Sequence, residues 1–182
     1  MNETFLFARH GATPENLRGL RCGGDLDEFL AEEGCRQSLE LAIGLRRQEY
    51  PVDLILTGPL RRTRQTALIV SGTLGDIPIE ISPWLVERRL GAWNCHPIAE
   101  NEEMLISGVT PPGGESSADF TSRIEHALAA VRERSGQRLL VIGSKGIGRV
   151  FNQLLGGKRR LVLENAQFVQ LPFLPPATNK AA

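Results

Sequence analysis

The hydrophobic positions of this chain form two patterns: short unbroken runs, and longer stretches in which apolar residues recur at helical spacing. Short apolar runs bounded by turn residues are typical of buried strands. The first such run is Thr4-Phe5-Leu6-Phe7-Ala8, which lies close to the N-terminus. The runs that predict strands are residues 4–8, 52–56, 77–81, 139–142 and 168–171.

The stretches between these runs have the spacing of amphipathic helices. In the first of them, Leu39, Ala42, Ile43 and Leu45 recur so that they share one helical face. The helices predicted in this way cover residues 32–48, 60–74, 117–135 and 146–155. Strands that alternate with helices form a mainly parallel sheet. The sequence therefore predicts an α/β fold, a three-layer sandwich with a mainly parallel central sheet and helices on both faces.

Two segments have neither pattern and are predicted to be irregular. Residues 12–30 contain several glycines, and residues 88–116 are rich in glycine and proline. The length of 182 residues indicates one domain. We place this domain at residues 1–174 and expect residues 175–182 to be a disordered C-terminal tail.

Composition and charge exclude several classes of function. Lys and Arg total 21 and Asp and Glu also total 21, so the basic excess of a nucleic-acid-binding protein is lacking. No apolar stretch reaches the roughly 20 residues of a membrane span, and the N-terminus lacks a basic signal-peptide region. The cysteines Cys22, Cys35 and Cys95 form no CxxC pair, which favours reduced thiols in a cytoplasmic protein. No residues have metal-ligand spacing, so neither a metal nor a cofactor is expected.

The most informative chemistry follows the first predicted strand, in the tripeptide Arg9-His10-Gly11. Ligands of open α/β sheets bind at the carboxyl ends of the strands. A neutral imidazole is a competent nucleophile near pH 7. An adjacent arginine disfavours the imidazolium and can bind phosphate oxygens. These residues are suited to accept a phosphoryl group, although a histidine that only ends a strand and bonds to a loop is the alternative.

Further segments support the interpretation that His10 accepts a phosphoryl group. The stretch that runs from Arg9 to Asn16 resembles the opening signature of the histidine phosphatase superfamily, which includes cofactor-dependent phosphoglycerate mutases. Four later segments are similar to further parts of that family's pattern, in order along nearly the whole chain. They are residues 26–34, 59–67, 85–93 and 112–116. The resemblance implies a phosphoglycerate mutase-like fold.

The resemblance also implies roles for individual residues. His10 is the expected nucleophile, which would form a phosphohistidine, and Glu87 is the expected general acid. Arg9 and Arg62 are the expected phosphate-binding arginines, and Asn16 the expected polar contact to the transferred group. For Glu87 the alternative is a surface carboxylate that pairs with a neighbouring arginine.

The chain departs from the family pattern after the fourth predicted strand. Where the family usually has a second histidine, the sequence has Ser144, which we expect to contact the substrate. Loss of one preorganised donor typically lowers the rate by roughly 10²–10³. An inward-facing Lys145 would restore a positive charge, with a solvated lysine as the alternative, and His96 is a further residue that could approach the pocket.

We therefore expect a metal-independent phosphomonoester hydrolase that acts through a phosphohistidine at His10 on a small phosphorylated metabolite, with activity weakened or specialised by Ser144. Hydrolysis is favoured over mutase action because the chain is short. The alternative is a catalytically impaired relative that binds a phosphorylated ligand or performs other chemistry on it. The acidic residues of segment 94–116 argue against a highly anionic substrate.

Overall fold

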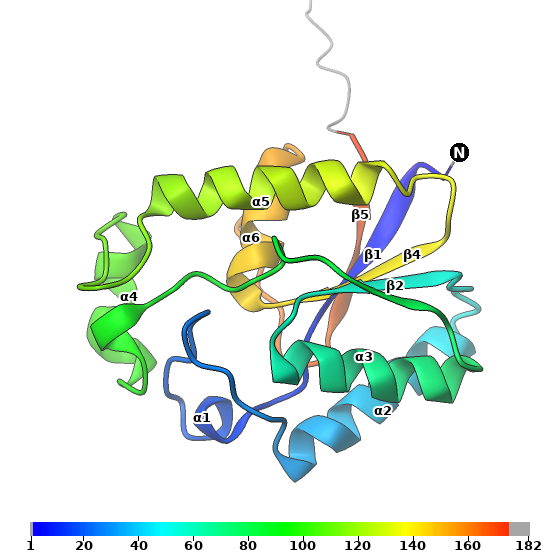
Figure 1. Cartoon of the computed structure of the whole chain (residues 1–182), viewed down its shortest axis with the longest axis horizontal. Coiled ribbons are helices and arrows are strands. Elements are labelled where there is room, and N and C mark those ends of the chain that lie inside the picture. The colour runs from blue at the N-terminus through cyan, green and yellow to red at the C-terminus, as the bar shows by residue number, and fades with distance from the viewer. Residues whose placement is uncertain (1, 175–182) are drawn as a thin grey trace, which may run out of the picture.

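A five-stranded sheet runs through the centre of the protein, whose computed structural model describes residues 2–174 (Figure 1). The spatial order of the strands is β3-β2-β4-β1-β5. Their bounds are β1 (Thr4–Arg9), β2 (Leu54–Thr57), β3 (Ile79–Ile81), β4 (Leu139–Gly143) and β5 (Phe168–Pro172). Four strands are parallel, and only β5 runs antiparallel, against β1. This arrangement confirms the predicted mainly parallel sheet.

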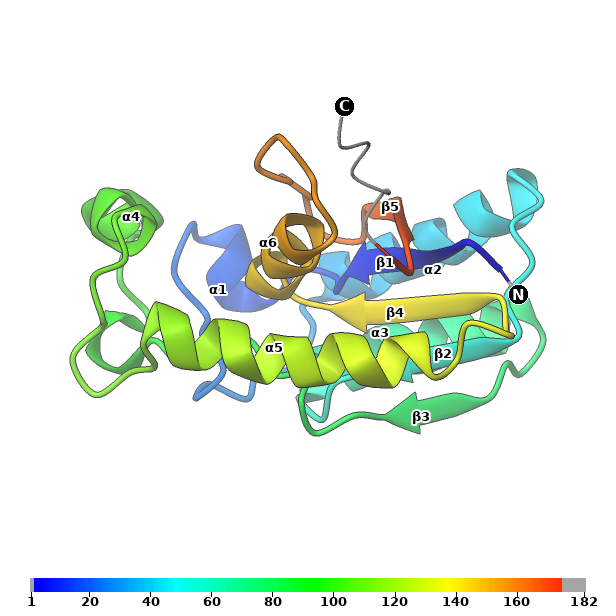
Figure 2. The ribbon, with the colours of Figure 1, turned by 90° about the horizontal axis from the view of Figure 1, so that it is seen from above.

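Helices cover both faces of the sheet, which confirms the predicted three-layer α/β architecture. One face carries α2 (Glu32–Arg47) and α3 (Arg61–Leu74), and the other carries α5 (Ser117–Arg132) and α6 (Lys145–Leu154). Figure 1 shows α5 and α6 above the sheet with α2 and α3 below it, and Figure 2 shows the strands in their order.

The alternation of side chains along β1 explains these two layers. Successive residues of a strand point to opposite faces of its sheet. Phe5 and Phe7 belong to the apolar cluster that includes residues of α5 and α6, whereas Leu6 and Ala8 belong to the cluster on the side of α2 and α3. Because both faces are covered, the interior strands are apolar throughout. This burial is why the strands stand out in the sequence as unbroken hydrophobic runs.

Two segments predicted as irregular contain helices. The short helix α1 (Pro14–Leu17) begins with a capping box in which Thr13 and Asn16 bond to each other's backbone, a local signal readable from sequence. The helix α4 (Ile98–Ile106) is harder to recognise because a kink at Asn101 interrupts its spacing. Both helices lie at the carboxyl end of the parallel strands (Figures 1 and 2), so they form part of the surroundings of the site.

The ends of β1 and β4 set the position of the candidate site. Arg9 and Gly143 are partners in the register of these strands, and the backbone N–H of His10 donates to the carbonyl of Gly143 at 2.9 Å. Therefore His10 and Ser144 leave neighbouring strands side by side. A Cβ on Gly11 would lie 2.2 Å from the carbonyl oxygen of Gly34, so this glycine is required by close packing against α2.

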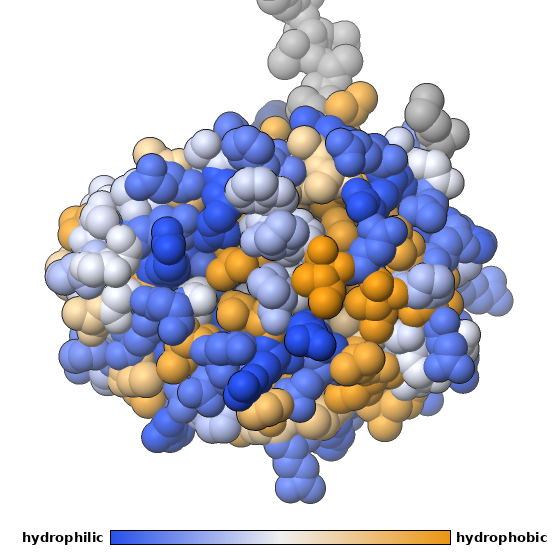
Figure 3. All heavy atoms as spheres, viewed as in Figure 1, coloured by the Kyte–Doolittle hydropathy of each residue, from blue (hydrophilic) through white to orange (hydrophobic). Residues whose placement is uncertain are grey.

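The surface of the protein carries both hydrophobic and hydrophilic residues. On the face in Figure 3, hydrophobic residues gather near the centre and hydrophilic residues surround them. Within residues 2–174 no helix has the length and hydrophobicity needed to cross a membrane. The three cysteines are free thiols. The tail expected at residues 175–182 lies outside the described residues.

Candidate active site

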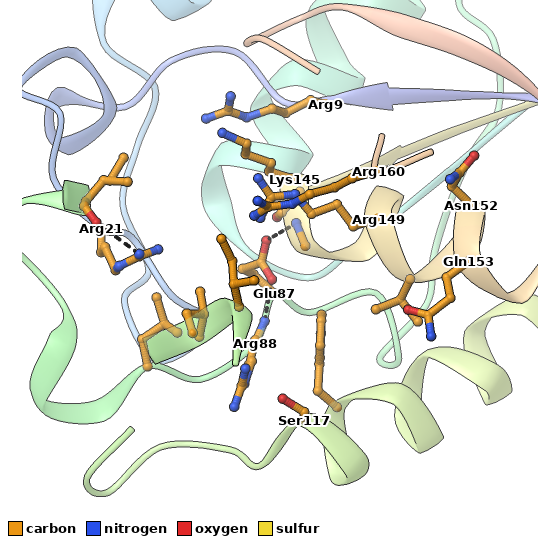
Figure 4. A pocket seen from close by; sticks show the side chains of 18 of the residues that line it. Arg9, Arg21, Glu87, Arg88, Ser117, Lys145, Arg149, Asn152, Gln153 and Arg160 are labelled. Carbon is orange, nitrogen blue, oxygen red and sulfur yellow. Dashed lines mark hydrogen bonds between the residues drawn. The ribbon is translucent and has the colours of Figure 1, made fainter. Parts of the chain in front are cut away.

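A cavity of about 520 Å³ opens at the carboxyl end of the sheet. It is lined by the end of β1, by α1, by the N-terminal part of α6, by the segment around Glu87 and by residues of α4 and α5 (Figure 4). Of the six residues singled out from the sequence, five line this cavity: Arg9, His10, Asn16, Glu87 and Ser144. Residues that are distant in sequence are thus brought together around one space.

His10 is held in a single neutral form by its surroundings. The side chain is buried, and its Nδ1 lies 2.7 Å from the carbonyl oxygen of Gly11. Because a carbonyl can only accept, Nδ1 carries the proton and Nε2 keeps its lone pair. Burial lowers the pKa of His10 well below its ordinary value, and the charges of Arg62 and Arg9 lower it further. The imidazole is therefore an uncharged base whose Nε2 has no hydrogen-bond partner within residues 2–174.

Arg9 combines a buried position with unused hydrogen-bonding capacity. One terminal nitrogen donates to the carbonyl of Leu163 at 3.0 Å, and the carboxylate of Glu164 lies 4.0 Å away. Its Nε is buried and has no partner among the described residues. Burial lowers the pKa of Arg9, although Glu164 and Glu87 oppose that effect. A buried guanidinium with a free donor is suited to receive an anion.

Arg62 acts on His10 by its charge but does not reach the cavity wall. The side chain is completely buried at the start of α3 and does not line the cavity. Both terminal nitrogens are engaged, at 2.6 Å with the carbonyl of Leu26 and at 3.0 Å with that of Gly23, and only Nε is without a partner in the described chain. As it stands, Arg62 acts on His10 through its charge, and phosphate binding by Arg62 stays a prediction.

Glu87 is fixed by backbone groups. Its side chain is buried, with one oxygen accepting from the N–H of Arg88 at 2.6 Å and the other from the N–H of Gly146 at 2.8 Å. Gly146 lies in the first turn of α6, so the carboxylate sits at a helix N-terminus, where negative charge is favoured. The alternative of a surface carboxylate is wrong, because Glu87 faces the cavity and bonds to main-chain amides (Figure 4).

Asn16 and Ser144 both contribute polar groups to the cavity wall. The side-chain oxygen of Asn16 accepts from Thr13 and Asn165 at 3.4 and 3.2 Å, which leaves its amide nitrogen for a ligand. Ser144 is 2% exposed and precedes α6, but its hydroxyl caps no backbone amide. The Oγ atom has no partner in the described part of the chain. A buried hydroxyl without a partner is costly and indicates a group that a ligand would satisfy.

The two further candidates from the sequence, Lys145 and His96, differ in their relation to the cavity. Lys145 is half-buried and lines the cavity, so the solvated alternative is wrong. Burial lowers the pKa of Lys145, and Arg149 and Arg9 lower it further. His96 is exposed and pairs with Glu100 at 3.3 Å outside the cavity. His126, the third histidine of the chain, is exposed on α5 and stacks on Trp84.

Sequence reasoning missed a basic rim around the cavity. This rim consists of Arg21, Arg88, Arg149, Lys158, Arg159 and Arg160. Glu102, from the segment expected to repel anions, is instead bonded by Arg21 and Arg160 at 2.8 Å each. The charge of Glu102 is thus neutralised and does not act against an anionic substrate, while the expectation about highly anionic substrates stays a prediction. These ion pairs join residues far apart in sequence, and no local pattern signals them.

Part of the wall is apolar. It is formed by the side chains of Leu20, Leu90, Ile98, Leu105, Ile106, Phe120 and Val150. The cavity can thus hold an anionic group together with a partly apolar remainder. Within residues 2–174 no three or more histidine, cysteine, aspartate or glutamate side chains are grouped in a way that could hold a metal ion.

Comparison of sequences identifies the same family as the sequence motifs. The family model described as histidine phosphatase superfamily (branch 1) matches residues 5–171. The chain is 30% identical to the "Probable phosphoglycerate mutase GpmB" of Escherichia fergusonii, across 91% of this chain and 82% of the relative. It is also 30% identical to the 2,3-bisphosphoglycerate-dependent phosphoglycerate mutase of Methylobacterium radiotolerans, across 86% of this chain and 81% of that protein.

Comparison of structures confirms the phosphoglycerate mutase-like fold. A mycobacterial glucosyl-3-phosphoglycerate phosphatase solved with VO3 superposes with a TM-score of 0.74 at 26% identity, over 92% of this chain and 90% of that one. The α-ribazole phosphatase of Shigella flexneri superposes with a TM-score of 0.75 at 22% identity, over 92% and 89%. Chains named as mutases and as phosphatases are therefore both similar to this protein.

Proposed function

Since the chain belongs to the histidine phosphatase superfamily (branch 1), we propose that it hydrolyses phosphomonoesters of a small metabolite through a phosphohistidine at His10. The observation that supports this most directly is the state of His10. The Gly11 carbonyl accepts a hydrogen bond from Nδ1 and so keeps the imidazole proton on that nitrogen. Burial and the charges of two arginines lower the pKa of His10. Such an imidazole presents an unprotonated Nε2 to the cavity at neutral pH.

The first step transfers the phosphoryl group to the enzyme. Nε2 of His10 attacks phosphorus, so that a P–N bond forms while the P–O bond to the alcohol breaks. The departing oxygen takes a proton from Glu87, whose carboxyl group lies in the same cavity and enters this step in its protonated form beside the bound phosphate dianion. Proton transfer by a positioned side chain typically contributes a factor of roughly 10²–10⁴ to the rate.

The second step regenerates the enzyme. The carboxylate of Glu87 takes a proton from water, and the resulting hydroxide attacks phosphorus while the P–N bond breaks. The products are inorganic phosphate and neutral His10, so the cycle consumes one water. The backbone amides of Arg88 and Gly146 keep the carboxylate in place for both steps.

Positive charge around the phosphoryl oxygens stabilises both transition states. Arg9 has an unpartnered Nε and Ser144 an unpartnered Oγ, and both belong to the cavity wall. Arg62 adds its charge, which also acts on His10. The donors are fixed before substrate arrives, which is the condition for electrostatic catalysis.

Hydrolysis is preferred here over transfer between substrates. Between β3 and α5, the described chain contains one turn of 3-10 helix (Gly91–Trp93) and one α-helix of nine residues, α4. We infer that water reaches the phosphohistidine past this cover. A mutase would have to retain its phosphorylated product against that water.

A phosphatase assay with matched histidine variants tests the proposal. We expect the wild-type protein to release phosphate from p-nitrophenyl phosphate and to form an acid-labile phosphoenzyme. His10→Ala should lose both, with a rate loss of roughly 10³ or more. His126→Gln, which changes an exposed histidine outside the cavity, is the control. Unchanged turnover in His10→Ala would refute the phosphohistidine mechanism.

A second candidate function rests on Ser144. If a serine at the position of the family's second histidine has abolished turnover, the protein is a binding relative that retains the anion pocket. Such a protein would bind vanadate or a phosphorylated ligand without releasing phosphate, and Ser144→His should then confer turnover. Phosphate release by the wild-type protein decides for the enzyme.

A further inference from the structure

We infer that Lys145 is a phosphate-binding catalytic residue, which together with Ser144 takes over the work that one histidine does elsewhere in the family. The inference rests on the proposed function, because it assigns a role within the same site. Ser144 would donate a neutral hydrogen bond to a phosphoryl oxygen. The ammonium group of Lys145 would supply the positive charge that serine lacks.

The position of Lys145 is the first support. It directly follows Ser144 and is the first residue of α6, and it lines the same cavity as Arg9 and His10. Figure 4 shows its side chain directed to the guanidinium end of Arg9. Arg9 is also among the charges that act on Lys145. The two cations therefore approach one another inside the cavity.

The lack of a counter-ion is the second support. Glu102 neutralises Arg21 and Arg160 at the rim, and Glu115 bonds Arg123 at 2.7 Å nearby. In the described part of the chain no carboxylate lies within ion-pair distance of Lys145; Glu164 and Glu102 act on it only from farther away. Two neighbouring cations in a partly desolvated site repel each other. A bound phosphoryl dianion would relieve that repulsion, whereas solvent alone does so incompletely.

Ser144 explains why a second group is needed. Its hydroxyl is buried, unpartnered and adjacent to His10 across the β1–β4 register. Serine is shorter than histidine and stays uncharged, so its contribution is limited to one hydrogen bond. Hydrogen bonds from charged donors are roughly twice as strong as neutral ones. A lysine on the next residue reaches farther and brings the charge.

Kinetics and oxyanion binding test the inference together. With p-nitrophenyl phosphate we expect Lys145→Met to lower kcat/KM by roughly 10²-fold and to weaken binding of orthovanadate by at least about tenfold. Lys145→Arg should remain within several-fold of the wild type because it keeps the charge. Arg64→Met removes an exposed positive charge from α3, outside the cavity, and should have no effect.

A rescue variant separates a catalytic role from a structural one. Ser144→His combined with Lys145→Ala should recover most of the activity that Lys145→Ala loses, because one histidine then supplies both donor and charge. Circular dichroism and thermal melting would show that each variant is folded. Equal activity and vanadate affinity in Lys145→Met and wild type would overturn the inference.

The two proposals can fail separately. If His10→Ala is inactive and Lys145→Met is fully active, the proposed function stands and the role of Lys145 is refuted. If His10→Ala retains full activity, the phosphohistidine mechanism fails and the inference fails with it. If no variant turns over substrate, vanadate binding still decides: affinity that does not depend on Lys145 refutes the inference.

Discussion

At the scale of single residues, the site depends on keeping one buried imidazole uncharged. Burial and two nearby arginines lower the pKa of His10, whereas an unfolded histidine titrates near pH 6.5. Below about pH 6.5 the unfolded chain therefore binds a proton that the folded protein does not. Folding stability must fall as the pH decreases from about 6.5 towards the lowered pKa of the folded state.

This linkage gives a prediction for the variant His10→Asn. The asparagine amide can still donate to the Gly11 carbonyl but does not titrate. We expect the urea midpoint of the wild type to decrease more steeply than that of His10→Asn as the pH falls below 6.5. Above pH 7.5 the difference between the two midpoints should be constant. Parallel pH profiles would show that His10 is not held neutral by the fold.

At the scale of elements, the start of α6 carries the general acid as well as Lys145. A Cβ on Gly146 would lie 2.2 Å from a carboxylate oxygen of Glu87. The end of a flexible side chain can move away, so Gly146→Ala should fold and displace Glu87. We expect kcat to fall by roughly 10²-fold, and more strongly for alkyl than for aryl phosphates, because alkoxides need the proton more.

The matched control for this change is Gly44→Ala in α2. No atom lies within 4 Å of a Cβ built at Gly44, and alanine in a helix interior is favoured over glycine by roughly 1 kcal/mol. This variant should keep full activity and gain thermal stability. If Gly146→Ala is as active as the control towards alkyl phosphates, the position of Glu87 is not the basis of its role.

The elements also show which features the sequence could reveal. Interior strands covered on both faces appear as apolar runs, so the sheet and the place of His10 at the end of β1 followed from pattern. The kink at Asn101 hid α4. The loop carbonyls that engage Arg62 come from residues 36 and 39 positions away. Contacts of that kind depend on tertiary packing and leave no local signal.

At the scale of the whole molecule, an overall neutral chain concentrates positive charge at one place. The formal net charge is zero, yet the cavity is lined by eight lysine and arginine side chains and, among the described residues, by one carboxylate, Glu87. The electrostatic field that acts on a substrate therefore depends on where the charges lie, and the net charge of the chain does not reveal it. A cleft of one sign can raise the association rate of an oppositely charged ligand by a factor of 10 to 10³, and salt weakens this effect.

Ionic strength should therefore affect the association of substrate with the enzyme more than the rate of the chemical step. Between about 20 mM and 500 mM NaCl the Debye length shortens from roughly 20 Å to 4 Å. Over this range we expect kcat/KM for a phosphate dianion to fall by roughly tenfold, with a much smaller change in kcat. The double variant Lys158→Gln/Arg159→Gln removes two rim charges and should have a shallower salt dependence. If kcat/KM of the wild type does not respond to salt, the basic rim does not attract the substrate, and binding depends on the contacts at the base of the cavity alone.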